Sequence, residues 1–185
     1  MTLLAISDSL RAASSNGVLL GAVLELARAG GWDGTAVAGI GELPLFNPDL
    51  DGEDAIAPEA VDALRQAVAR ADAVVIVSPE YAHGVPGALK NALDWLVSSA
   101  EFVDKPVAVI TASASGGAYA NAQLRETLRM MTATVVEGAC LTVPRAAAKI
   151  DHATGDVTDD ALREELRGAL GALRTAVRSA SAAAD

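Results

Sequence analysis

The chain has 185 residues, of which 51% are hydrophobic and 21% charged, and this length predicts one domain over residues 1–185 with a core that needs no metal. Its formal net charge of −10 argues against partners such as nucleic acid or an anionic membrane, because both require clustered lysine and arginine. Cys140 is the single cysteine, which excludes an internal disulfide and a thiolate zinc cluster and favours a cytoplasmic location.

Short β-branched runs alternate with longer segments of helical periodicity along the chain. In chain order, the first half predicts a strand at Thr2–Ser7, a helix at Asn16–Ala29, a short strand at Thr35–Ala38, a loop over Leu43–Asp54 and a helix that Pro58 opens. Ala73–Ser78 follows as a third strand, and its apolar run is typical of a central parallel strand that is buried on both faces.

The second half continues the same alternation. It predicts a helix from about Pro86, a strand at Pro106–Thr111, a helix at Gly117–Met131, a fifth strand within Thr134–Val143 and a last helix from about Thr158. Thr158 is the expected N-cap of that helix, and the alanine-rich end Ser179–Asp185 is expected to fray.

Five such units predict an α/β fold, a doubly wound parallel sheet with the strand order 2-1-3-4-5 between two layers of helices. In this topology the ligand site lies beyond the carboxyl ends of the strands, at the switch point between the first and third strands. Three loops are expected to meet there: Ser7–Ser15, Ser78–Pro86 and Thr111–Gly117.

The first loop leads from a strand into a helix, whose unpaired amides and partial positive charge attract a phosphate group. The residues that could add donors or a cation to such a site are Ser9, Arg11, Ser14, Ser15 and Asn16. The alternative is that one of Ser14, Ser15 and Asn16 caps the helix while Arg11 is solvated. Neither a G-x-G-x-x-G fingerprint nor a Walker A sequence is present.

The second loop carries Tyr81, whose flat ring suits packing beside a heteroaromatic group, and Pro79, which limits the conformations of the loop. Glu80 could act as a general base or could anchor the backbone. His83 is a candidate site residue or an exposed loop histidine. Beyond the loop, Lys90 and Asp94 have the spacing of a helical ion pair, and Trp95 is expected in a core or subunit contact.

The third loop, Thr111–Gly117, has two glycines that allow the backbone to approach a ligand closely, although Ser115 could simply cap the next helix. Together the three loops favour a planar, phosphorylated ligand that brings its own chemistry, and no side chain is assigned as a catalytic acid or base.

These loops resemble two motifs of the NADPH-dependent FMN reductase family, whose members include quinone, azo and chromate reductases. The family's phosphate loop has the form G-S-x-R-x-x-S-x-N, which the chain matches at Ser9, Arg11, Ser14 and Asn16, with Asp8 in place of the glycine. The second motif, P-E-Y-N-x-x-x-P-G-x-L-K-N-A-x-D-W, is matched from Pro79 to Trp95 with Ala82 in place of the asparagine. The resemblance covers about residues 3–143.

The resemblance implies a flavodoxin-like fold and an FMN-dependent oxidoreductase that passes hydride from NADH or NADPH through FMN to a small electron acceptor, such as free flavin, a quinone, an azo compound or a metal oxyanion. It implies that the matched residues of the first loop hold the FMN phosphate, and Ser15 in the same loop is a further candidate. It places Pro79, Glu80 and Tyr81 on one side of the flavin ring, and Ser113, Gly116 and Gly117 at its other edge, with His83 as a further candidate. A homodimer or homotetramer is implied, and a flavin-dependent monooxygenase is a further candidate partner.

Three other functions remain open from the sequence. The chain could be a non-catalytic electron carrier of the flavodoxin type, although such carriers lack an arginine like Arg11 in the phosphate loop. It could be a hydrolase that uses a serine with His83, although a G-x-S-x-G elbow is absent. It could also be a flavin-free scaffold in which Asp8 prevents phosphate binding.

Overall fold

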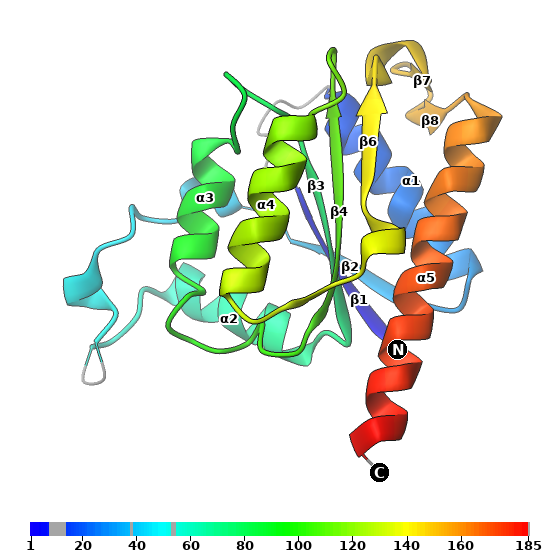
Figure 1. The fold of residues 1–185 in the computed structure, drawn as a ribbon. Helices are drawn as coiled ribbons and strands as arrows, with labels where there is room; N and C mark the ends of the chain where they lie inside the picture. The colour runs from blue at the N-terminus through cyan, green and yellow to red at the C-terminus, as the bar shows by residue number, and fades with distance from the viewer. Residues whose placement is uncertain (8–13, 38, 53–54, 185) are drawn as a thin grey trace.

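Six parallel strands form the sheet at the centre of the chain, whose computed structural model describes residues 1–7, 14–37, 39–52 and 55–184 (Figure 1). The strands are β1 (Thr2–Ser7), β2 (Asp33–Val37), β3 (Ala73–Ser78), β4 (Pro106–Ser113), β5 (Thr134–Val135) and β6 (Leu141–Pro144). Their order is β2-β1-β3-β4-β5, and β6 also pairs with β4. The predicted order 2-1-3-4-5 is therefore confirmed.

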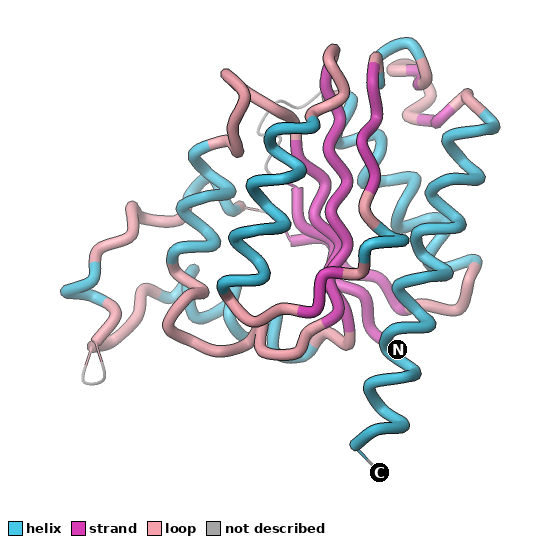
Figure 2. The backbone as a smooth tube through the Cα atoms, in the orientation of Figure 1, coloured by secondary structure: helices cyan, strands magenta, loops and turns pink. Residues whose placement is uncertain are grey.

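Helices cover both faces of the sheet and make three layers (Figure 2). They are α1 (Ser15–Ala29), α2 (Glu59–Arg70), α3 (Gly87–Asp94), α4 (Ala118–Met130) and α5 (Asp160–Ala184). Leu3 and Ala5 of β1 pack with α1 and α5, whereas Leu4 and Ile6 pack with α2, α3 and α4. Successive strand side chains point to opposite faces, so covering both faces requires the nearly continuous apolar runs of the sequence. No described helix is long and apolar enough to cross a membrane.

The predicted fifth strand is the main difference between the expected and observed folds. Within Thr134–Val143, β5 pairs with the start of β4 and β6 with its end, and a 3₁₀ turn at Glu137–Ala139 separates them. Val135 pairs with Val107 of β4, and Leu141 pairs with Ile110. Five residues separate Val135 from Leu141, but only two separate Val107 from Ile110, so the extra residues form the turn. A Cβ added to Gly138 in this turn would lie 3.6 Å from the Cβ of Ala172 in α5, so the turn packs closely against α5.

Several element ends also differ from the predictions. The N-cap of α5 is Asp159 rather than Thr158, because Asp159 Oδ1 accepts a hydrogen bond from the amide of Leu162 at 2.8 Å. The helix continues to Ala184, and the expected fraying from Ser179 stays a prediction. Strand β2 begins two residues earlier than predicted, at Asp33, and β4 ends two residues later, at Ser113.

The segment 43–52 is largely irregular, as predicted, and α3 holds it in place. Asn91 accepts a hydrogen bond from the amide of Phe46 and donates one to Pro44 O, at 2.8 and 3.0 Å. Trp95 is fully buried and donates to the same carbonyl. Its expected core position is thus confirmed, and both residues of the second motif have structural contacts.

Candidate functional site

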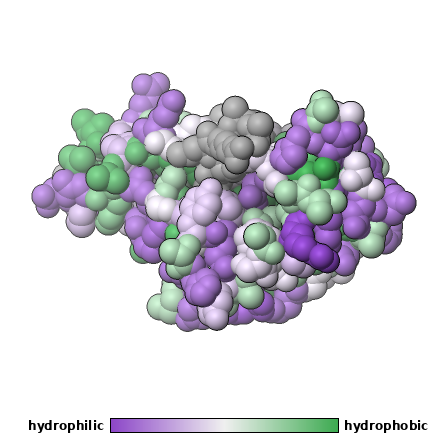
Figure 3. Space-filling model, turned by 90° about the horizontal axis from the view of Figure 1, so that it is seen from above, coloured by the Kyte–Doolittle hydropathy of each residue, from purple (hydrophilic) through white to green (hydrophobic). Residues whose placement is uncertain are grey.

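A cavity of about 690 Å³ opens at the carboxyl edge of the sheet, where the ends of β3 and β4 meet the first turn of α1. It lies at the top of the molecule in Figure 1, and Figure 3 looks down on this edge. Its lining residues come from the three predicted loops and from the segment after β6: Ser14, Ser15, Asn16, Pro79, Glu80, Tyr81, Ala112, Ser113, Ala114, Arg145, Ala146, Ala147, Ala148 and His152. Its position is the one that the switch-point rule predicts.

Ser14 begins α1 at the edge of the cavity. Its Oγ accepts a hydrogen bond from the amide of Gly17 at 2.9 Å, so Ser14 is the N-cap. A hydroxyl that accepts in this way still has its own proton to donate. The capping interpretation is therefore confirmed for Ser14, and it is compatible with a contact to a ligand at the same helix end.

Asn16 lies in the first turn of α1 and is only 6% exposed. Its Nδ2 donates to Ala112 O at 3.4 Å, which links α1 to the end of β4. Its Oδ1 is buried and accepts no hydrogen bond from any residue that the structure describes. A buried acceptor without a donor costs free energy, so this atom is suited to a donor on a bound molecule.

Glu80 joins the second loop to the third. Its Oε2 accepts a hydrogen bond from the amide of Ala120 at 2.9 Å, and its Oε1 accepts one from the Ser115 hydroxyl at 3.3 Å. The carboxylate thus satisfies an amide in the first turn of α4, where a negative charge is favourable. Glu80 is therefore a backbone anchor, and Ser115 binds it instead of capping α4.

Tyr81 forms the rim of the cavity and is 62% exposed. It pairs with Gly84 around a tight turn in which Ala82 and His83 have φ values of 50° and 59°. Both central residues of this turn have positive φ, which is an unfavourable conformation for residues other than glycine and asparagine. Strain of this kind is common at binding sites, where the surrounding structure must hold the backbone.

The third loop also has an unusual backbone. Gly117 has a φ of 79°, and a Cβ at this position would lie 2.9 Å from Cβ of Thr111, so only glycine fits. Ser113 accepts a hydrogen bond from the amide of Gly116 at 3.0 Å, and its carbonyl accepts one from the amide of Arg145 at 3.0 Å. The loop is therefore fixed both within itself and to the segment that follows β6.

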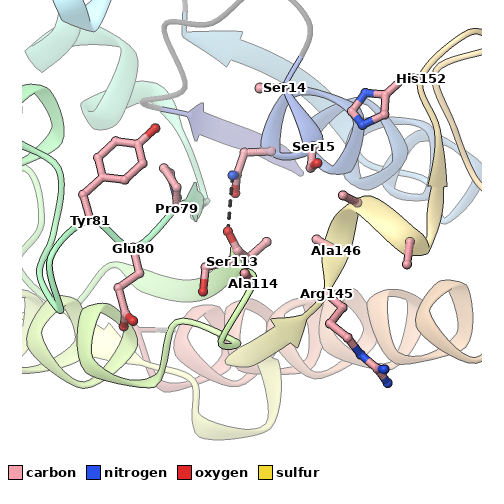
Figure 4. A pocket seen from close by; sticks show the side chains of 14 residues that line it. Ser14, Ser15, Pro79, Glu80, Tyr81, Ser113, Ala114, Arg145, Ala146 and His152 are labelled. Atoms are coloured by element: carbon pink, nitrogen blue, oxygen red, sulfur yellow. Dashed lines mark hydrogen bonds between the residues drawn. The ribbon is translucent and has the colours of Figure 1, made fainter.

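That segment forms a wall of the cavity that the sequence did not predict. It contributes Arg145, three consecutive alanines and His152, which lies between the short strands β7 (Ile150–Asp151) and β8 (Asp156–Val157). In Figure 4, His152 and Ala146 lie across the cavity from Tyr81 and Glu80. Alanines carry no chemical signal in a sequence, and the structure holds this segment through the bond from the Arg145 amide to Ser113 O.

The predicted site residues divide into three groups. The structure brings seven of them to the cavity: Ser14, Ser15, Asn16, Pro79, Glu80, Tyr81 and Ser113. Three do not line it: Gly116 and Gly117 shape the third loop behind Ser113, and His83 stacks on Tyr119 with ring centres 4.2 Å apart. Ser9 and Arg11 lie outside the described residues.

The chain is similar to known flavin-dependent reductases. The family model for NADPH-dependent FMN reductase matches residues 1–148. A quinone reductase of Escherichia coli is 36% identical over 88% of this chain and 87% of its own length. An NAD(P)H-dependent FMN reductase of Pseudomonas aeruginosa is 35% identical over 95% of this chain and 94% of its own. Among solved structures, a flavoenzyme NAD(P)H:acceptor oxidoreductase of Paracoccus denitrificans aligns with a TM-score of 0.79 and 30% identity, over 96% and 97% of the two chains.

Proposed function

The chain belongs to the NADPH-dependent FMN reductase family, and we therefore propose that its cavity binds FMN and that the protein transfers electrons from NADH or NADPH to a small acceptor. The observation that carries this proposal is that Oδ1 of Asn16, in a cavity that opens at the N-terminus of α1, accepts no hydrogen bond from the described residues. Quinone and azo reductases among the relatives support a small organic acceptor.

The cavity has the features that FMN requires. Its volume is in the range of small-molecule sites. The first turn of α1 offers amides and the Ser14 hydroxyl to an anionic phosphate, and the Asn16 carboxamide offers an acceptor to a ribityl hydroxyl. Apolar alanines and Tyr81 border the remaining space, which suits a flat ring system.

The residues of the chain would act by binding and orientation. FMN, when bound, supplies the hydride and electron transfer chemistry. The first turn of α1 would hold the anionic tail, and Tyr81 with Ser113 and Ala114 would border the ring. Glu80 keeps the second and third loops together through its bonds to Ala120 and Ser115, so both loops would present a fixed surface to the ring.

No side chain is proposed as an obligatory acid or base. Both carboxylate oxygens of Glu80 accept hydrogen bonds from the third loop and α4. The ring of His83 stacks on Tyr119 outside the cavity lining. This arrangement does not favour a hydrolase built on His83, and it agrees with a site in which the cofactor carries the reaction.

The proposal also covers the oligomeric state, the partners and the location of the protein. A homodimer or homotetramer is supported by large apolar side chains on the surface, including Leu45 and Ile56, which are 84% and 94% exposed. Hydrophobic side chains gather toward the left of Figure 3, on the side of the molecule where the segment 43–52 projects in Figure 1. The acceptor could also be a flavin-dependent monooxygenase, and a cytoplasmic location is part of the proposal.

The test is an FMN titration followed by anaerobic addition of NADH and NADPH. We expect one FMN per chain, with loss of the oxidised flavin absorbance on addition of the nicotinamide. Ala114→Trp fills the cavity and should weaken FMN binding at least tenfold, whereas Ala180→Trp, on the exposed end of α5, should leave it unchanged. Equal binding by both variants, or no binding by the wild type, would contradict the proposed site. Binding of FMN without its reduction would indicate an electron carrier.

A further inference from the structure

We propose that His152 is a proton-dependent contact for the phosphate of FMN, so that the protein holds FMN more tightly when this imidazole is charged. The inference rests on the proposed function of the cavity. It concerns a residue that lies beyond the part of the chain that the family model matches, residues 1–148.

The fold fixes His152 at the phosphate end of the cavity. His152 lines the same cavity as Ser14 and Ser15, and Figure 4 shows its ring beside the first turn of α1. His152 lies in the turn of the hairpin that β7 and β8 form. Ile150 of β7 and Val157 of β8 are buried in the core with α1 and α5, and this packing holds the hairpin in place. Its turn is closed by Asp151, whose Oδ1 accepts from the amide of Ala153 at 2.8 Å.

Two independent features support a bound molecule at this end of the cavity, and the first of them favours an anionic group. The first turn of α1 presents unpaired backbone amides and a partial positive charge. Beside them, the buried Oδ1 of Asn16 accepts no hydrogen bond from the described residues. The amides suit the phosphate of FMN, and the carboxamide oxygen suits the adjoining hydroxyl-bearing chain. A cation at His152 would complete the contacts to the phosphate.

Among the described residues, the other charged groups do not replace His152 in this role, and Asp8 and Arg11 of the first loop lie outside those residues. Arg145 lines the cavity, but in Figure 4 its side chain points away from Ser14 and Ser15. Glu80 lies across the cavity and is bonded to Ala120 and Ser115. The remaining charged residues of the hairpin and of the first turn of α5 are Lys149, Asp151, Asp156, Asp159, Asp160 and Arg163. Carboxylate, ammonium and guanidinium groups ordinarily keep their charge between pH 5.5 and 8, whereas an imidazole changes its charge there.

The expected pH dependence follows from this difference. As the pH falls from 8 to 6, the imidazole gains a proton and attracts the phosphate, so the Kd for FMN should fall. Below a pH of about 6 the phosphate dianion itself takes up a proton, which opposes the gain. The affinity should therefore be greatest near this pH. Because the contact is exposed, we expect the change to be about two- to fivefold.

The experiment compares the wild type with His152→Gln by fluorescence titration of FMN and of riboflavin from pH 5.5 to 8. His152→Gln should remove the additional affinity for FMN near pH 6 and should leave riboflavin, which lacks the phosphate, unaffected. The matched control is His83→Gln, because His83 is the second of the two histidines and does not line the cavity. This variant should keep the pH dependence of the wild type.

Each outcome of the titration decides the inference. If FMN binds to the wild type and His152→Gln shows the same pH dependence, the inference is wrong and the proposed function stands. An equal effect on riboflavin would also overturn it, because the contact would not be to the phosphate. No binding of FMN to the wild type at any pH would reject the inference and the proposed function together.

Discussion

At the scale of single residues, Glu80 shows how one side chain can set the geometry of a site without taking part in a reaction. Its two oxygens bind the amide of Ala120 and the hydroxyl of Ser115, and so connect the loop after β3 to the start of α4. The sequence supported both a general base and a backbone anchor at this position. The contacts decide for the anchor.

Removal of this carboxylate should loosen the site. Glu80→Ala leaves the amide of Ala120 without its acceptor and should lower the free energy of unfolding by about 1 kcal/mol. It should also weaken FMN binding, because the second and third loops would no longer be joined. Glu80→Gln retains an acceptor oxygen and should recover most of both losses. Urea unfolding and FMN titration measure the two effects, and an Ala variant as stable as the wild type would contradict the anchoring role.

A substitution at Ala82 should stabilise the protein. Its φ of 50° is costly for alanine and acceptable for asparagine, the residue found there in the family motif. Ala82→Asn should therefore raise the free energy of unfolding by about 0.5–1 kcal/mol. The control is Ala122→Asn on the exposed face of α4, which should lower it by about 0.5 kcal/mol. Urea denaturation tests both, and a destabilised Ala82→Asn variant would show that the turn is not strained.

The sequence identified some of these residues and missed others for physical reasons. Ser14, Glu80 and Tyr81 were predictable because they follow strands at the switch point, where a loop residue has few packing roles. His152 was not predicted, because it lies well beyond the fifth strand and nothing around it in the sequence indicates a site. Its position depends on the packing of β7 and β8 against the core.

At the scale of elements, regular periodicity made most helices and strands predictable, and local hydrogen bonds explain the exceptions. The run Thr134–Val143 has the composition of one strand, but its 3₁₀ turn is held by tertiary contacts. Glu137 in this turn forms ion pairs with Arg125 and Arg129 of α4. Asn121 of α4 is buried and donates to Leu141 O at 3.0 Å, which holds the start of β6. Such contacts between distant segments are not visible in a local pattern.

The segment 43–52 depends on another tertiary contact. Asp51 pairs with Arg65 of α2 at 2.5 Å and accepts a hydrogen bond from Ser98 at 2.6 Å, and both partners of the ion pair are largely buried. Burial opposes the ionisation of Asp51, but the hydrogen bonds of Ser98 and Arg65 and the charge of Arg65 outweigh it and lower the pKa of Asp51. Ionised Asp51 therefore stabilises the folded chain.

This contact gives a prediction for the pH dependence of stability. Because the pKa of Asp51 is lower in the folded state, its contribution is complete above the unfolded pKa and is lost as the pH falls through the folded value. Asp51→Asn should lower the free energy of unfolding by about 1–3 kcal/mol at pH 7, and by less as the pH falls below about 4. Asp49→Asn, an exposed neighbour, should have little effect. Urea unfolding from pH 3 to 7 measures this, and a difference that does not depend on pH would contradict it.

At the scale of the whole molecule, the order of the strands and the three layers were predictable, because buried parallel strands and right-handed crossovers leave few topologies. The place of the site was predictable for the same reason. The extent of the cavity was not, since one wall is made by Ala146–Ala148 and the hairpin that follows them. Oligomerisation stays a prediction that light scattering of the purified protein would test.

The central claim is that the cavity between α1, the loop after β3 and the loop after β4 is the FMN site. The most direct test is a crystal structure of the protein with FMN bound. We predict the phosphate at Ser14 and Ser15, the ribityl chain at Asn16 and the ring beside Tyr81. Flavin bound elsewhere, for example in the groove beside Trp32 between Arg167 and Arg174, with this cavity empty, would contradict the account.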